Sequence, residues 1–417
     1  MKRALKITAI TLSSIIAIAA IAIIIVCNVV FSSKTLTPIV RNNVGRFITC
    51  QADLDTAELT FFSTFPNFAI NLSNVRVINP IAEAQSDTLA YVGRLAASVN
   101  VSQFLFKGNL VINQVHLDNT TANIFCDSLG NANYNIVALT STEEEDSTST
   151  SLFDLLQVDD VTINNLSATY IDQKSGIDAR IDNISASING KLQGANGEIN
   201  AQCSIHNAQC IIDNAQCTID NAQLNTSGEL RDNHFDGKIA LTLPSTTFDL
   251  DGNRLADSLA LRANVPAEVN LDIMHINLKD ALVAVNSHEI NLNGVAQLDN
   301  DDINLDIQFA TNQWNIEELI ALIPEAYADL LEGINISGNA SLSGSARGTY
   351  NDSIMPLISA NLNYTDGRVQ YSELPLPVDN INLSISANAD LNPNGNIQCT
   401  MHNEKLTNSY KQFISPH

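Results

Sequence analysis

Residues 302–309 read Asp-Ile-Asn-Leu-Asp-Ile-Gln-Phe, a strict alternation of polar and apolar side chains. The same alternation returns in residues 380–385, Asn-Ile-Asn-Leu-Ser-Ile, and in residues 290–293, Ile-Asn-Leu-Asn. Successive side chains of a β-strand point to opposite faces of the sheet, so each segment has one apolar and one polar face. The pattern predicts amphipathic strands and a protein that is mostly β.

Pairs of Asn or Asp with Gly separate many of the alternating segments and predict hairpin turns. They are Asp251-Gly252, Asn293-Gly294, Asp366-Gly367 and Asn394-Gly395. Short connections favour antiparallel neighbours. The sequence therefore predicts a long, curved antiparallel sheet of about 30 strands, folded like a groove or a taco shell and accompanied by a few short helices.

The N-terminal segment has the features of a membrane anchor. Three basic residues, Lys2, Arg3 and Lys6, precede the apolar residues 7–31. About 20 apolar residues suffice to cross a bilayer, whereas the core of a cleaved signal peptide is usually shorter. We expect an uncleaved transmembrane helix with a cytoplasmic N-terminus. A cleaved signal and a lipoprotein at Cys27 are the alternatives, the second disfavoured by the bulky Val26 before it.

The chain divides by composition into five parts. Residues 1–32 form the cytoplasmic stub and the anchor, and residues 33–140 a first β segment that opens with a helix near the membrane. Residues 141–151 form an acidic flexible loop. Residues 152–397 form a longer repetitive β-groove, interrupted by helical spacing at residues 315–331. Residues 398–417 lose the alternation and form an atypical tail, which suggests a chain shortened at its C-terminus.

Composition and motifs exclude several classes of function. The formal net charge of −24 repels nucleic acid, whose binding depends on cationic side chains. The seven cysteines show no CxxC spacing, and no His or Cys cluster has the spacing of metal ligands. Two Asp-rich segments, 249–253 and 299–302, lack the remaining ligands of a calcium loop. No catalytic motif is present, so we expect no enzyme, no cofactor and no metal.

A seven-residue repeat occupies residues 200–223. Four Asn-Ala-Gln triplets begin at Asn200, Asn207, Asn214 and Asn221, and three units read Cys-x-Ile-(His/Asp)-Asn-Ala-Gln. An odd period would move each position to the other face of a continuous strand on successive repeats. The repeat is interpreted as a tandem expansion on a strand or loop, with a true structural repeat as the alternative.

Several segments in order resemble the AsmA family of bacterial envelope proteins, particularly its Bacteroidota-type members. They are Leu36-Thr37-Pro38-Ile39 after the anchor, Glu58 to Phe68 (ELTFFSTFPNF), Asp127 to Tyr134 (DSLGNANY), Tyr170 to Ile177, Gly348-Thr349-Tyr350-Asn351 and Gly367 to Pro375 (GRVQYSELP). Ala69 stands where a Gly is common in the family. The resemblance implies a single-pass inner-membrane protein with a periplasmic β-groove, a role in phospholipid movement or outer-membrane biogenesis, and no catalytic residues.

The amphipathic sheet leads to the same class of function, because a wide apolar face must be covered by something. Acyl chains of phospholipids lying in a trough would satisfy it. The candidate lipid-facing residues are Ile303, Leu305, Ile307, Phe309, Ile381, Leu383 and Ile385. Expected partners are therefore the membrane and phospholipid acyl chains. A self-packed β-sandwich, or an assembly factor that acts on proteins targeted to the outer membrane, is the alternative.

Overall fold

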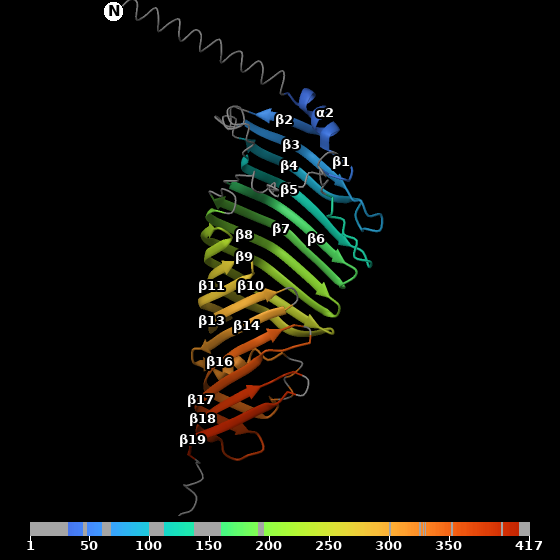
Figure 1. The fold of residues 1–417 in the computed structure, drawn as a ribbon. Coiled ribbons are helices and arrows are strands. Elements are labelled where there is room, and N and C mark those ends of the chain that lie inside the picture. The colour runs from blue at the N-terminus through green and yellow to red at the C-terminus, as the bar shows by residue number, and fades with distance from the viewer. Residues whose placement is uncertain are drawn as a thin grey trace, which may run out of the picture. The chain divides into compact units, whose positions relative to one another are not determined.

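The structure is a computed structural model, and it contains nineteen strands and two helices among the residues that it describes (Figure 1). Those residues are 32–44, 48–60, 68–99, 112–136, 160–190, 196–299, 302–324, 327, 329, 331–351, 353–392 and 395–407. The prediction of a mostly β chain with few helices is confirmed. Fewer strands occur than the predicted number because single strands are long; β11 alone has 18 residues.

The chain forms two compact units, here called unit 1 (Met1–Gly194) and unit 2 (Ala195–His417). The strands of unit 1 are β1 (Ala52–Asp53), β2 (Thr56–Thr60), β3 (Phe68–Ile78), β4 (Thr88–Val99), β5 (Ile112–Cys126), β6 (Asp160–Asp172) and β7 (Ile177–Gly190). Both β1 and β2 pair with β3, and the order then follows the chain to β7.

One pair in unit 1 departs from the predicted antiparallel order. β5 and β6 are parallel, with Gln114 opposite Asp160 and Cys126 opposite Asp172. A parallel pair needs a connection of a dozen residues or more. Residues 127–159, which include the predicted acidic loop 141–151, supply that length. The loop itself lies outside the described residues.

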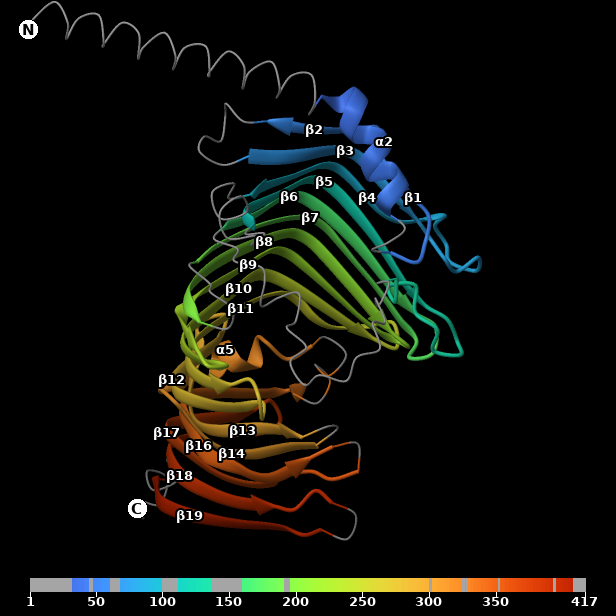
Figure 2. The same ribbon diagram turned by 45° about the horizontal axis from the view of Figure 1, so that its top comes forward.

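Helix α2 (Ser33–Asn43) lies along the first edge of unit 1, beside β2 (Figure 2). The Ala57 backbone N–H donates to Thr37 Oγ1 at 2.9 Å, and Arg41 pairs with Asp53 at 2.7 Å. Arg41 also donates to the Leu54 carbonyl oxygen. The helix thereby satisfies backbone groups that an open sheet edge would leave unpaired. It confirms the helix predicted after the anchor, over residues 33–43.

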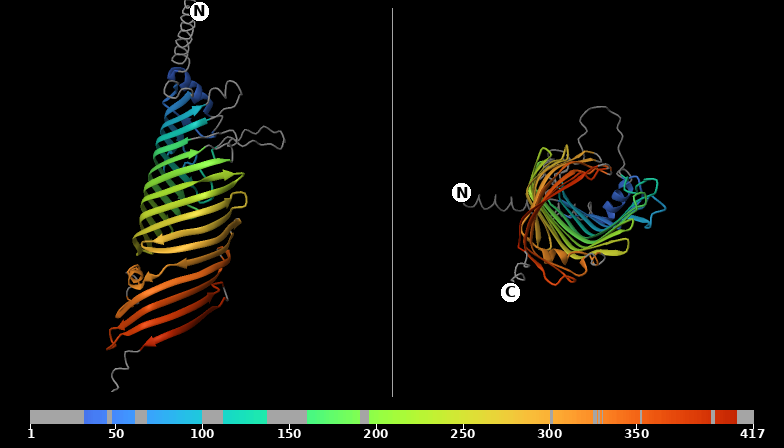
Figure 3. Two further views of the ribbon diagram at one scale, coloured as in Figure 1. Left: turned by 90° about the vertical axis from the view of Figure 1, so that its left-hand side faces the viewer. Right: turned by 90° about the horizontal axis from the view of Figure 1, so that it is seen from below.

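The strands of unit 2 are β8 (Gly197–Ile212), β9 (Ala215–Arg231), β10 (His234–Leu250), β11 (Asn253–Asn270), β12 (His275–Val285), β13 (His288–Asp299), β14 (Asp302–Thr311), β15 (Trp314–Asn315), β16 (Ile334–Tyr350), β17 (Leu357–Tyr371), β18 (Val378–Ala389) and β19 (Ile397–Thr407). Consecutive strands pair antiparallel from β8 to β14 and from β16 to β19, and β14 and β15 both pair with β16. Figure 3 shows them side by side. β19 extends the sheet into the segment expected to be an atypical tail, because backbone pairing does not require alternation.

Left-handed residues occur inside nine of the strands, and eight of the nine are Asn or Asp. They are Asn74, Asn119, Asn165, Asn183, Asn221, Ser258, Asp280, Asp366 and Asn380, with φ between 50° and 57°. Asn and Asp tolerate this conformation better than other non-glycine residues. Six of them, in β6, β7, β11, β12, β17 and β18, lie at register shifts of the kind that a bulge produces, and bulges bend a strand. They account for the bends visible in the long strands (Figure 2).

Two of the predicted turns are wrong, because their dipeptides lie inside bent strands. Asn293-Gly294 and Asp366-Gly367 lie inside β13 and β17, whereas Asp251-Gly252 forms the turn between β10 and β11. Gly294 has φ +137° and Asp366 has φ +51°. A bulge and a tight turn both require such backbone angles, so the same dipeptide serves either purpose.

The seven-residue repeat is folded back on itself as the β8–β9 hairpin. Its middle copy, Ile212-Asp213-Asn214-Ala215, makes the turn, and its last copy places the left-handed Asn221 within β9. Apolar positions in the repeat are spaced two or three residues apart. In β9 the three-residue step from Ile219 to Ala222 contains the left-handed Asn221, which lets apolar side chains on both sides of it stay on one face and so accommodates the odd period.

Replacing Asp280 with valine is expected to lower the free energy of unfolding by about 1–2 kcal/mol, because valine is strained in the left-handed region. Asp280 is exposed, and its backbone N–H donates to Asn293 Oδ1 at 2.7 Å, a bond that any residue retains. Asp280→Gly is the matched control and should change stability by less than about 0.5 kcal/mol. Chemical denaturation of the full chain measures both. Equal losses in the two variants would show that the backbone angle is not the cause.

The predicted transmembrane residues 7–31 lie outside the described residues. Within the described part of the chain, neither helix has the length and apolar content needed to cross a bilayer. Helix α5 (Ile316–Ile320) begins at the predicted place but is shorter than the predicted segment 315–331.

Candidate functional site

One face of unit 2 is apolar across many strands, because the pairing aligns apolar residues in rows. A row through Ile307 of β14 contains Leu278, Gly294, Ile307, Ala346, Ile358, Ala389 and Ile397. The next row contains Ala281, Leu292, Phe309, Gly344, Ala360, Ala387 and Cys399. Directly paired residues point to the same side of a sheet. We call this surface the apolar face.

The seven candidate residues from the sequence all lie on the apolar face. Four belong to β14, and Ile381, Leu383 and Ile385 belong to β18. The two strands are joined by β16 and β17, where Ile385 is opposite Leu362 and Leu383 is opposite Tyr364. The structure therefore brings two segments of separate sequence into one continuous surface.

The apolar face has little protein over it. Among the described residues of unit 2, the buried apolar residues are Ile381 and the alanines Ala222, Ala267, Ala281, Ala284 and Ala340. The large side chains of β14 are only half-buried, and they alternate with exposed polar ones. A β-sandwich of this size would bury many large side chains between its two layers. The described residues supply no such second layer.

Aromatic rings on the apolar face lie over glycines of neighbouring strands. A Cβ atom at Gly344 would lie 2.6 Å from Phe309 Cζ, and one at Gly228 would lie 2.6 Å from Phe235 Cε2. The rings thus occupy space that a side chain would otherwise fill. Tyr364 lies against Gly338 of β16 in the same way and donates its hydroxyl to the Ser337 carbonyl oxygen at 2.6 Å. Burial raises the pKa of Tyr364 above its ordinary value.

Charged side chains of unit 2 gather on the opposite face. Arg347 pairs with Asp306 at 2.8 Å, between the strands that carry Ile307 and Ala346 on the apolar face. Lys279 and Asn277 bond the Glu268 carboxylate and lower its pKa. Thr349 donates to Asn304 at 2.8 Å on the same polar face. Each strand therefore keeps its ionic groups away from the apolar side.

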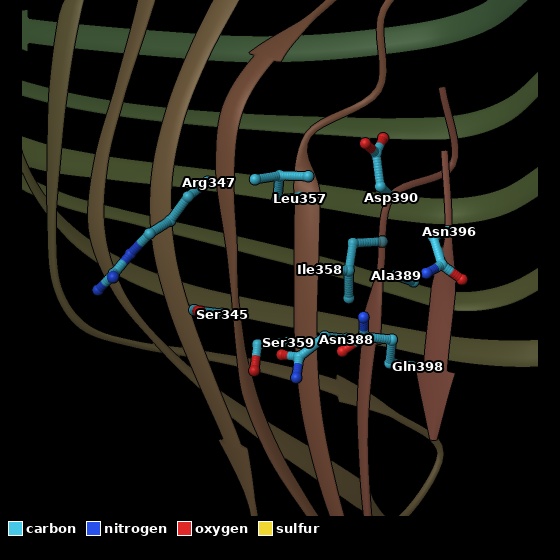
Figure 4. Close-up of a pocket in the computed structure, with 10 residues that line it drawn as sticks. All are labelled: Ser345, Arg347, Leu357, Ile358, Ser359, Asn388, Ala389, Asp390, Asn396 and Gln398. Atoms are coloured by element: carbon cyan, nitrogen blue, oxygen red, sulfur yellow. The ribbon is translucent and has the colours of Figure 1, made fainter. Parts of the chain in front are cut away.

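The hollow drawn in Figure 4 lies on β16 to β19 and shares Ile358 and Ala389 with the apolar face. Ser345, Ser359, Asn388 and Gln398 are opposite one another on β16, β17, β18 and β19, and they form a polar row in the figure. Arg347 and Asp390 complete its charged margin. Leu357, Ile358 and Ala389 add apolar side chains, so the lining of the hollow combines polar and apolar groups.

Helix α5 and Trp314 cover one place on the apolar face. Trp314 is paired with Ala340, and its ring meets the His288 ring edge-on at 5.5 Å between centroids. His288 is 5 % exposed, and Glu318 of α5 approaches its Nε2 at 3.6 Å. Asn315 caps the helix by accepting the Glu317 N–H at 2.8 Å. The sequence reading missed this cluster, although Trp314 is the single tryptophan of the chain.

Elsewhere in the described residues, few side chains are arranged as a metal-binding or catalytic site would require. No group of three or more His, Cys, Asp or Glu side chains there is arranged to hold a metal ion. The most deeply buried polar side chain is Asn133, which has a structural role in unit 1. The apolar face is thus the candidate functional site of the described residues.

Comparison with known proteins agrees with this architecture. Residues 1–349 match the AsmA family. The chain belongs to the AsmA family. No curated protein and no solved structure matches this AsmA-family chain at a significant level. Membership indicates a protein of the cell envelope with a long β-sheet, and it confirms the resemblance in the sequence.

Proposed function

We propose that this protein is a non-enzymatic lipid carrier of the cell envelope that holds phospholipid acyl chains on the apolar face of unit 2. The observation that carries the proposal is the absence of a covering layer among the described residues, although the face is apolar across β12 to β19. An apolar surface of this width is unfavourable in water. Acyl chains would cover it while leaving their headgroups hydrated.

The dimensions of the face agree with this ligand. From β12 to β19 the face crosses seven rows of strands, with β15 continuing the row of β14. At about 4.8 Å between rows, they extend about 30 Å across the sheet. One leaflet of a bilayer core is about 15 Å thick. The face therefore has room for more than one acyl chain in succession, which is what a conduit requires.

The rest of the proposal concerns location. An anchor at residues 7–31 would fix the protein in the inner membrane, with the β units in the periplasm and the N-terminus in the cytoplasm. The four proposed parts, 33–140, 141–151, 152–397 and 398–417, would then lie outside the membrane. Lipids would move along the face toward the outer membrane.

A photoactivatable phospholipid with a diazirine in its acyl chain tests the proposal on the full-length protein. Crosslinked peptides should come from the apolar face, in particular from β14 and β18, in addition to the apolar N-terminal segment. Crosslinks restricted to residues 7–31 would contradict lipid binding by unit 2. Capture of outer-membrane proteins by a protein–protein crosslinker, with no acyl crosslink in unit 2, would instead support the assembly-factor alternative.

A further inference from the structure

Two cysteines of the repeat stand directly opposite each other in the β8–β9 hairpin. Cys210 of β8 is paired with Cys217 of β9, and the turn between them is Asp213-Asn214. Both thiols are free and half-buried. Paired residues of antiparallel strands have Cα atoms about 4.5–5.5 Å apart, which lies within the range that a disulfide spans.

We propose that Cys210 and Cys217 are a disulfide site, and that the bond fixes the register of the β8–β9 hairpin. The inference stands on this hairpin alone and does not depend on lipid binding.

A bond that fixes the register is useful because the repeat offers alternative positions for the turn. The turn uses Ile212-Asp213-Asn214-Ala215, and the repeat supplies near-identical tetrapeptides at residues 205–208 and 219–222. A hairpin that turned at His206-Asn207 would place Cys203 opposite Cys210 instead. Repeated sequences specify register weakly. Only the observed register brings Cys210 to Cys217, so a bond between them would exclude the others.

The third cysteine of the repeat is out of reach in the folded chain. Cys203 is opposite Leu224, and it lies seven residues from Cys210 on the same strand. At about 3.3 Å per residue, Cys203 and Cys210 are roughly 23 Å apart, far beyond the 7 Å limit for a disulfide. The folded hairpin therefore allows the Cys210–Cys217 bond and excludes the Cys203–Cys210 bond.

The chemistry requires a disulfide oxidant, such as an oxidised dithiol protein or oxidised glutathione. One cysteine thiolate attacks the oxidant and forms a mixed disulfide, and the second cysteine displaces the remaining oxidant thiol. The two cysteines lose two protons and two electrons, and the oxidant becomes two thiols. Burial and the neighbouring Cys210 raise the pKa of Cys217, so the reaction should accelerate as the pH rises.

The test oxidises the full-length protein with oxidised glutathione, under native conditions and again in strong denaturant. Free thiols are then alkylated and the chain is cut with trypsin and with a protease that cleaves before Asp. Cleavage before Asp213 and before Asp220 separates peptide 213–219 from peptide 192–212. A Cys210–Cys217 bond keeps these two peptides joined, whereas a Cys203–Cys210 bond lies within peptide 192–212. The Cys203→Ser variant excludes a Cys203–Cys217 bond.

The denatured chain is an internal control, because both candidate bonds close loops of equal length and should form in similar amounts. The native chain should favour Cys210–Cys217 over Cys203–Cys210 by at least about tenfold. In Cys203→Ser, the native linkage should persist. The same mixture in native and denatured protein, a predominant Cys203–Cys210 bond, or glutathione adducts without an internal bond would each overturn the proposal.

Discussion

Full-length protein in which Leu305 and Ile307 are both replaced by glutamate is expected to lose at least about nine tenths of the acyl crosslinking at unit 2. Both side chains lie on the apolar face, in the middle of β14. A carboxylate facing an acyl chain costs a few kcal/mol, and 1.4 kcal/mol corresponds to a tenfold change in binding. The measurement is the yield of crosslinked peptides per molecule of protein.

A matched control is available on the same strand. Asn304→Glu with Gln308→Glu adds the same two charges to β14, but on its polar face, where Asp306 already carries a carboxylate. This variant should crosslink as the unmodified protein does. Because both double variants leave the paired backbone unchanged, similar thermal unfolding would confirm that both fold. Equal crosslinking in the two variants would contradict lipid contact with the apolar face.

Replacing Asn133 with alanine is expected to destabilise unit 1 by about 2–4 kcal/mol, because two buried backbone groups lose their partner. Asn133 is fully buried. Its Oδ1 accepts the Phe125 N–H at 2.9 Å, and its Nδ2 donates to the Asn123 carbonyl oxygen at 2.8 Å. Hydrogen exchange of the Phe125 amide should accelerate accordingly. Leu129→Ala, at an 84 % exposed position in the same loop, is the control and should leave exchange unchanged.

The Asn133→Asp variant tests the same hydrogen bonds through the pH dependence of the free energy of unfolding. Burial and the Asn123 carbonyl oxygen would raise the folded-state pKa of the new carboxyl above its unfolded value. A raised carboxyl pKa means that the ionised form destabilises the fold, so the loss is largest at neutral pH and shrinks as the pH falls through the raised pKa. The protonated carboxyl can again donate to Asn123. A loss that does not depend on pH would indicate a packing defect instead.

The loop around Asn133 shows what a resemblance leaves unexplained. Residues 127–134 help to identify the family, yet the sequence alone does not explain why these residues occur in this order. In the structure Asp127 accepts the N–H groups of Leu129 and Asn131, at 2.9 and 2.8 Å, and so forms the turn. Bonds from Asn131 hold the pKa of Asp127 below its ordinary value. The turn brings Asn133 back onto β5, a contact between residues that periodicity cannot relate.

The alternation in residues 302–309 and 380–385 by itself determined the class of fold and the apolar side of each strand. Side-chain direction in a strand depends only on local backbone geometry, so a single segment suffices to predict it. Family membership could likewise be predicted from the order of short motifs in the sequence. The candidate residues of β14 and β18 could be named for this reason.

Only the tertiary structure decided how these segments combine. Register placed Ile307 and Ile385 on one face through the strands between them, and it set Cys210 opposite Cys217. Asn293-Gly294 and Asp366-Gly367 lie inside strands, not at hairpin turns, because partner strands continue past them. Pairing partners and backbone angles depend on groups distant in sequence, so no local pattern contains them.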